Sequence, residues 1–177
     1  MTEKIDIAEI LKDKPANTKL YSPLFGEVYF SHVGGGNIAV EHHGGISLFF
    51  SSGRFFDYDE SEPLLFPSKE MRDWRKFAWK KGDVLVNSRG LKILFDRWAN
   101  DNYTSFYAKT INLVEDGFLD TNLLTLASEK EAKSFIKCIE EKLGGKLNRE
   151  TLEVEKTQPE FKDGDIAFAD YGNRQDV

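Results

Sequence analysis

The sequence predicts an α+β fold built from two repeated small β-barrel modules of the Src-homology-three type, with short helices. The segment Trp-Lys-Lys-Gly-Asp-Val-Leu-Val at residues 79–86 returns at residues 161–168 as Phe-Lys-Asp-Gly-Asp-Ile-Ala-Phe, and a weaker copy, Gly-Glu-Val-Tyr-Phe, occupies residues 26–30. In each copy an acidic residue follows glycine, and an alternation of apolar residues typical of a β-strand begins. The segments between the copies are short apolar runs separated by glycine-rich turns, which favours small barrels.

The composition limits the kind of protein that this chain can be. It has 177 residues and a net charge of −6, and an acidic total argues against a general binder of nucleic-acid phosphates. Its single cysteine, Cys138, can form no intrachain disulfide, so we expect a reducing, cytoplasmic compartment. Residues 1–13 contain no signal-peptide apolar run, and no segment is as long as a transmembrane helix. We therefore expect no membrane partner.

The first predicted helix is short, and module one follows it. Asp6 and Glu9 have the spacing of a capping box, the next apolar residues share one helix face, and Pro15 ends the helix. Module one extends from about residue 19 to residue 66, with tight glycine-containing turns between its strands. Its predicted strands are residues 26–33, 37–41, 46–50, 54–58 and 64–66.

Module two repeats this plan and leads into a stronger helix. Its glycine turn at residues 115–120 matches the turn at residues 51–57. Ser128 and Glu131 form a capping box, the helix ends at Gly144, and a hairpin is expected after it. The apolar residues of the third copy need burial, so we expect that strand to complete a sheet. The predicted strands of module two are residues 83–86, 92–98, 105–113 and 121–126.

We divide the chain into residues 1–78 and residues 79–177. The first part holds the N-terminal helix, the first barrel module and a connector helix; the second holds the second module, the helix with its hairpin and the C-terminal strand. In the connector, Met71, Trp74 and Phe77 recur at helical spacing. We expect Trp74 to be buried between the modules, because an exposed indole would forgo roughly 2 kcal/mol of burial.

Polar motifs that could carry chemistry have simpler structural interpretations. His42 and His43 are neighbours on an extended chain, so their side chains point to opposite faces and are poorly placed to share a metal ion with His32. The glycines at residues 34–36 are followed by neither the lysine nor the helix of a phosphate-binding loop. The acidic residues within 57–62 lack the spacing of a calcium loop. We therefore expect no metal and no cofactor.

Aromatic side chains are the remaining functional signal. Adjacent aromatic residues on a strand point to opposite faces, so one ring of each pair at residues 49–50, 55–56 and 106–107 is expected to face outward. Such a ring either packs under a helix or forms a binding surface for a partner, and the sequence leaves both interpretations open. The candidate binding residues are Phe50, Phe55, Phe56, Tyr58, Trp98, Tyr103 and Tyr107.

The run Leu-Phe-Pro-Ser-Lys-Glu-Met-Arg-Asp-Trp at residues 65–74, with Thr-Lys-Leu-Tyr-Ser at residues 18–22 and Gly-Glu-Val at residues 26–28, resembles a family of uncharacterised proteins. They are encoded by gut Bacteroides-type bacteria and by their phages and mobile elements. The helix and hairpin at residues 129–154 and the Phe-Lys-x-Gly-Asp opener also recur there. The resemblance covers most of the chain. It implies an origin in such genomes and carries over no catalytic or binding residue.

We therefore expect a non-enzymatic binding or adaptor protein that holds a protein or peptide partner on an aromatic surface. No catalytic constellation is present in the sequence, and small barrels commonly serve as binding modules. The resemblance adds a phage- or mobile-element-derived, host-directed role. One alternative is a nucleic-acid-binding barrel, which we do not favour because its only dense basic stretch runs from Arg72 to Lys81. A second alternative is an enzyme or a small-ligand binder of unknown class.

Overall fold

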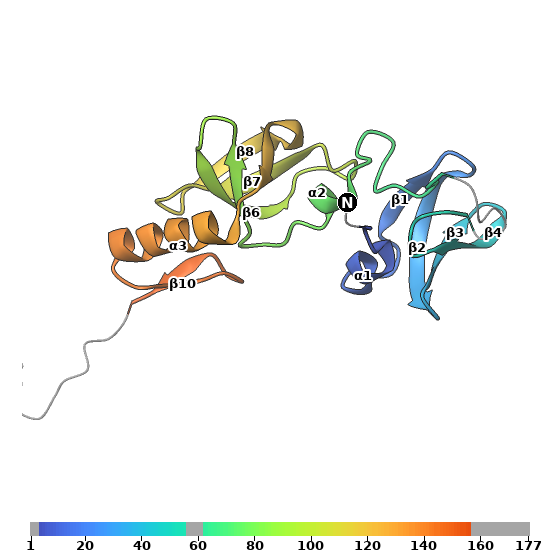
Figure 1. Cartoon of the computed structure of the whole chain (residues 1–177), viewed down its shortest axis with the longest axis horizontal. Coiled ribbons are helices and arrows are strands. Elements are labelled where there is room, and N and C mark those ends of the chain that lie inside the picture. Colours follow the sequence, from blue (N-terminus) through green and yellow to red (C-terminus); the bar gives the residue numbers. More distant parts are fainter. Residues whose placement is uncertain (1–3, 56–61, 157–177) are drawn as a thin grey trace, which may run out of the picture.

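The chain is a mixed α+β protein in which antiparallel sheets predominate and the helices are few and mostly short. The computed structural model describes residues 4–55 and 62–156. Two lobes lie side by side: residues 4–55 with 62–77, and residues 79–156 (Figure 1). The elements are α1 (Ile7–Lys12), β1 (Lys19–Ser22), β2 (Gly26–Gly34), β3 (Asn37–His42), β4 (Gly45–Phe50), α2 (Trp74–Phe77), β5 (Val84–Asn87), β6 (Lys92–Trp98), β7 (Ser105–Lys109), β8 (Glu115–Asp120), the 3-10 turn η1 (Thr121–Leu123), β9 (Leu124–Leu126), α3 (Glu129–Leu143), β10 (Lys146–Asn148) and β11 (Glu153–Glu155).

The two main sheets share one order of pairing. In the first lobe β1 to β4 form a meander, and Phe66 returns to pair on the free side of β1. In the second lobe β5 to β8 form a meander, and β9 returns to pair with β5. The second strand of each sheet bulges against the third, between Phe30 and His32 in β2 and between Phe95 and Arg97 in β6. Neither sheet closes into a barrel within the described residues.

The predicted repeat is out of phase with the strands by one element. Gly26 begins β2, the second strand of its sheet, whereas Gly82 precedes β5, the first strand of its sheet. The two segments are therefore not equivalent strands, and aligning them with each other is wrong. Residues 115–120 form strand β8 rather than a turn, and their polar sequence reflects their place at a sheet edge. The copy at residues 161–168 lies outside the described residues.

The first core lies between the inner face of the first sheet and the helices α1 and α2. Asp6 caps α1 by accepting a hydrogen bond from the Glu9 backbone N–H, as the sequence predicts. Ile7 and Leu11 of that helix and Phe77 of α2 are buried in this core. Their burial fixes both helices on the sheet, because helices this short are marginal alone in water.

The second sheet is covered on both faces. One face packs around Trp79 and Phe106, and the other packs against α3 and the β10–β11 hairpin through Phe135 and Ile139 (Figure 1). The predicted capping box of Ser128 and Glu131 and the left-handed Gly144 at the end of α3 are confirmed. Cys138 of α3 is exposed, since it lies about 100° around the helix from the buried Ile139. No helix within residues 4–55 and 62–156 has the length and apolar character needed to span a membrane.

Gly82 holds the β10–β11 hairpin against the start of β5. Its φ is +85°, and a Cβ there would lie 2.6 Å from the carbonyl oxygen of Arg149. The Arg149 guanidinium donates to the Gly82 carbonyl oxygen from Nε at 3.0 Å and from Nη2 at 2.8 Å. Only glycine satisfies both the left-handed conformation and this approach.

Gly82→Ala is expected to lower the free energy of unfolding by about 3 kcal/mol, because a strained left-handed residue and a backbone clash act together. Gly90→Ala is the matched control: its φ is +80°, and a Cβ at that position would have no atom within 4 Å. It should cost only about 1 kcal/mol, the conformational part alone. Denaturant unfolding measures both variants, and equal losses would contradict the close approach.

Candidate functional site

An unbroken chain of aromatic contacts joins the two cores. Phe77 of α2 meets Tyr103 edge to face with ring centroids 4.8 Å apart, and Tyr103 meets Trp98 at 5.5 Å. Trp98 then stacks on Trp79 with centroids 6.0 Å apart and an interplanar angle of 9°. The Tyr103 hydroxyl donates a hydrogen bond of 3.0 Å to the carbonyl oxygen of Lys19 in β1. The loop between β6 and β7 thus docks the second lobe on the first.

Two of the candidate binding residues therefore serve packing and not an exposed surface. Tyr103 is only 9% exposed, and Trp98 packs against both cores, which corrects the expectation for this pair. Trp74 is buried as expected, but it lies in the first core, where its indole N–H donates to the Leu65 carbonyl oxygen at 3.0 Å. The predicted burial is confirmed, whereas the contact between the lobes is made by other rings.

The remaining candidates are half-buried or lie outside the described residues. Phe49 and Phe106 are fully buried, so the expected alternation places the rings that follow them on the opposite faces of β4 and β7. The Arg97 guanidinium lies 4.1 Å from the centroid of the outward Tyr107 ring. Phe55 packs against Phe49 at 5.4 Å. Phe50, Phe55 and Tyr107 are half-buried, and Phe56 and Tyr58 lie outside the described residues.

Basic side chains that follow α2 form ion pairs within the protein. Lys81 pairs at 3.0 Å with Asp96, whose side chain is 6% exposed, and Arg97 pairs with the same carboxylate. Burial alone would raise the pKa of Asp96, but the two cations outweigh it and hold that pKa below its usual value. Lys80 reaches Asp13 of the first lobe at 2.8 Å. These cations neutralise acidic groups of the protein itself.

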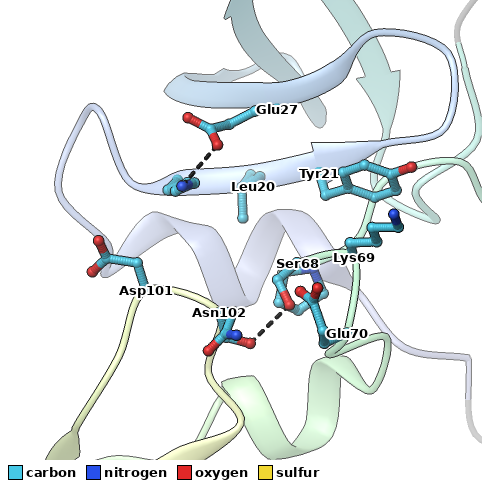
Figure 2. A pocket seen from close by; sticks show the side chains of 10 residues that line it. Leu20, Tyr21, Glu27, Ser68, Lys69, Glu70, Asp101 and Asn102 are labelled. Carbon is cyan, nitrogen blue, oxygen red and sulfur yellow. Dashed lines mark hydrogen bonds and ion pairs between the residues drawn. The ribbon is translucent and has the colours of Figure 1, made fainter.

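A groove of about 430 Å³ marks the junction of the lobes (Figure 2). Lys19 lines one side and pairs with Glu27 at 2.7 Å. On the other side the Ser68 hydroxyl donates to the Asn102 carbonyl oxygen at 2.8 Å and accepts from the Met71 N–H at 2.8 Å. Ser68 thus fastens the lobes together and begins no helix. These polar groups of the groove already form hydrogen bonds or ion pairs with other groups of the protein.

The outward face of the first sheet carries a row of apolar side chains. Tyr29 pairs with Glu41 and Glu41 pairs with Ile46, so these three side chains share a face. Leu48 and Phe50 follow Ile46 at alternate positions of β4 and lie on the same face. Tyr29 is 40% exposed, Ile46 64% and Leu48 40%. We call Tyr29, Ile46, Leu48 and Phe50 the apolar stripe.

A hollow of about 270 Å³ adjoins the apolar stripe. Glu27 on its rim is bound to Lys19 and to the Tyr29 hydroxyl, and these two partners hold the pKa of Glu27 below its usual value. The side chain of Glu41 is exposed, and its carboxylate forms no hydrogen bond or ion pair with the described part of the chain. One carboxylate of the hollow is therefore compensated and the other is not. The hollow is lined by Glu27, Tyr29, Glu41, His42 and His43.

His42 is held by the fold. Its Nδ1 accepts a hydrogen bond of 3.0 Å from the Gly44 N–H, so the ring proton lies on Nε2, which donates to the Ser47 hydroxyl at 2.8 Å. The ring stacks on Phe25 with centroids 4.1 Å apart. Both nitrogens are occupied, and His43 is exposed. Among the described residues no three His, Cys, Asp or Glu side chains gather as metal ligands would.

Comparison with protein-family models, with curated proteins and with solved structures yields no match. The function must therefore be argued from the site alone. The stripe residues Tyr29, Ile46 and Leu48 and the carboxylate of Glu41 are absent from the sequence-based candidates. The signal for Ile46 and Leu48 lies in residues 46–50, Ile-Ser-Leu-Phe-Phe, where apolar side chains occupy both faces of one strand. Tyr29 and Glu41 join them only through the pairing of β2, β3 and β4.

Tyr103 makes the junction sensitive to alkaline pH. Burial raises its pKa from 10.0 to about 12, so the folded chain holds the phenolic proton more tightly than the unfolded chain does. The stability from neutral Tyr103 is present below pH 10 and is lost as the pH rises to about 12. Tyr103→Phe is expected to lower the free energy of unfolding by about 1 kcal/mol at neutral pH, through loss of the hydroxyl hydrogen bond.

The free energy of unfolding of the same variant should also fall less steeply than that of wild type as the pH rises from 10 to 12. Denaturant unfolding at a series of pH values measures the difference, and comparison with wild type removes the contribution of the other tyrosines and lysines. Parallel curves for the two proteins would show that Tyr103 does not titrate at the junction.

Proposed function

We propose that this chain is a non-enzymatic binding protein that holds a protein or peptide partner on the outward face of its first sheet. The apolar stripe is the observation that supports this. The inward residues Val28, Val40 and Phe49 of the same strands are fully buried, so the sheet already has its core. The outward side chains of Tyr29, Ile46 and Leu48 are exposed, and covering them would contribute roughly 25 cal/mol per Å² of apolar area.

The proposal favours a protein partner over the other two classes. Of the lysines that a nucleic acid would need near α2, Lys80 and Lys81 are paired with Asp13 and Asp96, and Lys76 donates to the Thr121 carbonyl oxygen. The polar groups at the lobe junction bind one another and do not converge on a shared point, as catalytic groups would. Ile46 and Leu48 lie on one exposed sheet face, with Tyr29 on the far side of Glu41. Such a surface is of the kind that protein partners cover.

We also propose that the two lobes are two copies of one small module of the Src-homology-three type. The common strand order and the bulge in each second strand support it. The N–H groups of Leu64 and Leu65 also donate to the Gly53 carbonyl oxygen at 2.8 and 3.2 Å, which brings the returning strand toward the end of β4. An origin in a phage or mobile element, with a host-directed role, is proposed on the sequence resemblance alone.

Selection of a phage-displayed random peptide library on the immobilised protein tests the stripe. Wild type is expected to enrich peptides with apolar residues, because these side chains can cover the stripe. The double variant Ile46→Asp, Leu48→Asp should lose these peptides, since docking on it would bury unpaired charge. Leu123→Asp is the matched control, because Leu123 is 69% exposed on the second lobe. It should enrich the same peptides as wild type.

If the Ile46→Asp, Leu48→Asp variant and the Leu123→Asp control enrich the same peptides, the stripe is not the binding surface. Analytical ultracentrifugation of the same proteins identifies another occupant. A wild-type dimer that becomes a monomer only in the Ile46→Asp, Leu48→Asp variant would mean that a second copy of this chain covers the stripe, and would replace the proposed partner.

A further inference from the structure

The hollow and the apolar stripe form one continuous surface. Tyr29 belongs to both, and Glu41 stands between Tyr29 and Ile46 in the strand ladder. A segment that covers the stripe therefore passes directly over the hollow. Whatever side chain it carries at that point must meet the groups that line the hollow.

Those groups have an excess of negative charge. The charge of Glu27 is compensated by Lys19 at 2.7 Å, and its other contact fixes the Tyr29 hydroxyl. Glu41 has no such partner in the described part of the chain. His42 does not supply one, because its Nδ1 accepts from Gly44 and its Nε2 donates to Ser47. One uncompensated carboxylate thus remains beside an aromatic ring.

We propose that this hollow binds a positively charged side chain, so the partner is a basic, apolar segment that carries an arginine or lysine beside its apolar residues. The inference rests on the proposed function. A carboxylate accepts charge-assisted hydrogen bonds from a guanidinium, and the face of an aromatic ring attracts a cation. Glu41 and the Tyr29 ring supply these two features side by side.

Other occupants fit the hollow less well. An anionic side chain would meet the uncompensated charge of Glu41. A metal ion would need further ligands, and the described residues gather no set of three. An apolar side chain would leave the Glu41 carboxylate covered and unpaired, which is unfavourable. A cation is the occupant that satisfies both the charge and the ring.

Titration of the ¹⁵N-labelled protein with L-argininamide and, separately, with L-citrullinamide tests the hollow directly. The two probes have similar shapes, and only the first carries a guanidinium. Argininamide is expected to shift the amide resonances of Tyr29, Glu41 and Ile46 with a Kd on the order of millimolar, as suits one small contact. Citrullinamide should bind about tenfold more weakly, which corresponds to about 1.4 kcal/mol.

Glu41→Gln should remove this preference for argininamide, whereas Glu153→Gln, which changes an exposed glutamate of β11, should keep it. Equal shifts with the two probes, or a preference that survives Glu41→Gln, would overturn the cation site. The selected peptides separate this outcome from the function. Apolar peptides that lack arginine and lysine would leave the stripe standing and refute the hollow. Argininamide binding without any enriched peptide would support the cation site and refute the apolar stripe as a peptide-binding surface.

Discussion

The aromatic chain from Phe77 through Tyr103 and Trp98 to Trp79 is the constraint on which the arrangement of the two lobes depends. Each ring is also part of a core, so the lobes cannot separate without exposing core surface. Aromatic pairs in these geometries contribute roughly 0.5–1.5 kcal/mol each beyond their buried area. The hydrogen bond from Tyr103 to the Lys19 carbonyl oxygen adds direction to contacts that by themselves have little.

Packing dominates over hydrogen bonding at this junction. The Nε1 of Trp98 is buried and has no hydrogen-bond partner among the described residues, which costs roughly 1–3 kcal/mol. The ring remains there because its stacking on Trp79 and its contacts with both cores outweigh that cost. On the other side the Lys14 amino group lies 4.8 Å from the centroid of Phe77, and burial lowers the pKa of this lysine. Among the described residues, no acidic side chain lies within hydrogen-bonding distance of this amino group, so the Phe77 ring is its neighbour in place of a carboxylate.

The contacts at the junction fix the position of the first sheet relative to the second lobe. The inner face of this sheet is filled by the first core, and its outer face presents Ile46 and Leu48 beside the carboxylate of Glu41. Apolar contacts supply binding energy without direction, whereas a single uncompensated charge supplies register. In the function that we propose, the two together select an apolar segment by the position of one cation. In the junction groove, the hydrogen bond from Ser68 to Asn102 links the two lobes (Figure 2).

The sequence by itself determined the local elements of this protein. The cap of α1 at Asp6 and the capping box of Ser128 and Glu131 were predictable because each is made by residues a few positions apart. The alternation of Phe49 and Phe50 was predictable for the same reason. Only the tertiary structure decided that Tyr103 is buried, because its partner Phe77 is distant in the chain. It likewise decided which face of β4 is left in water, because that depends on where α1 and the returning segment around Phe66 pack.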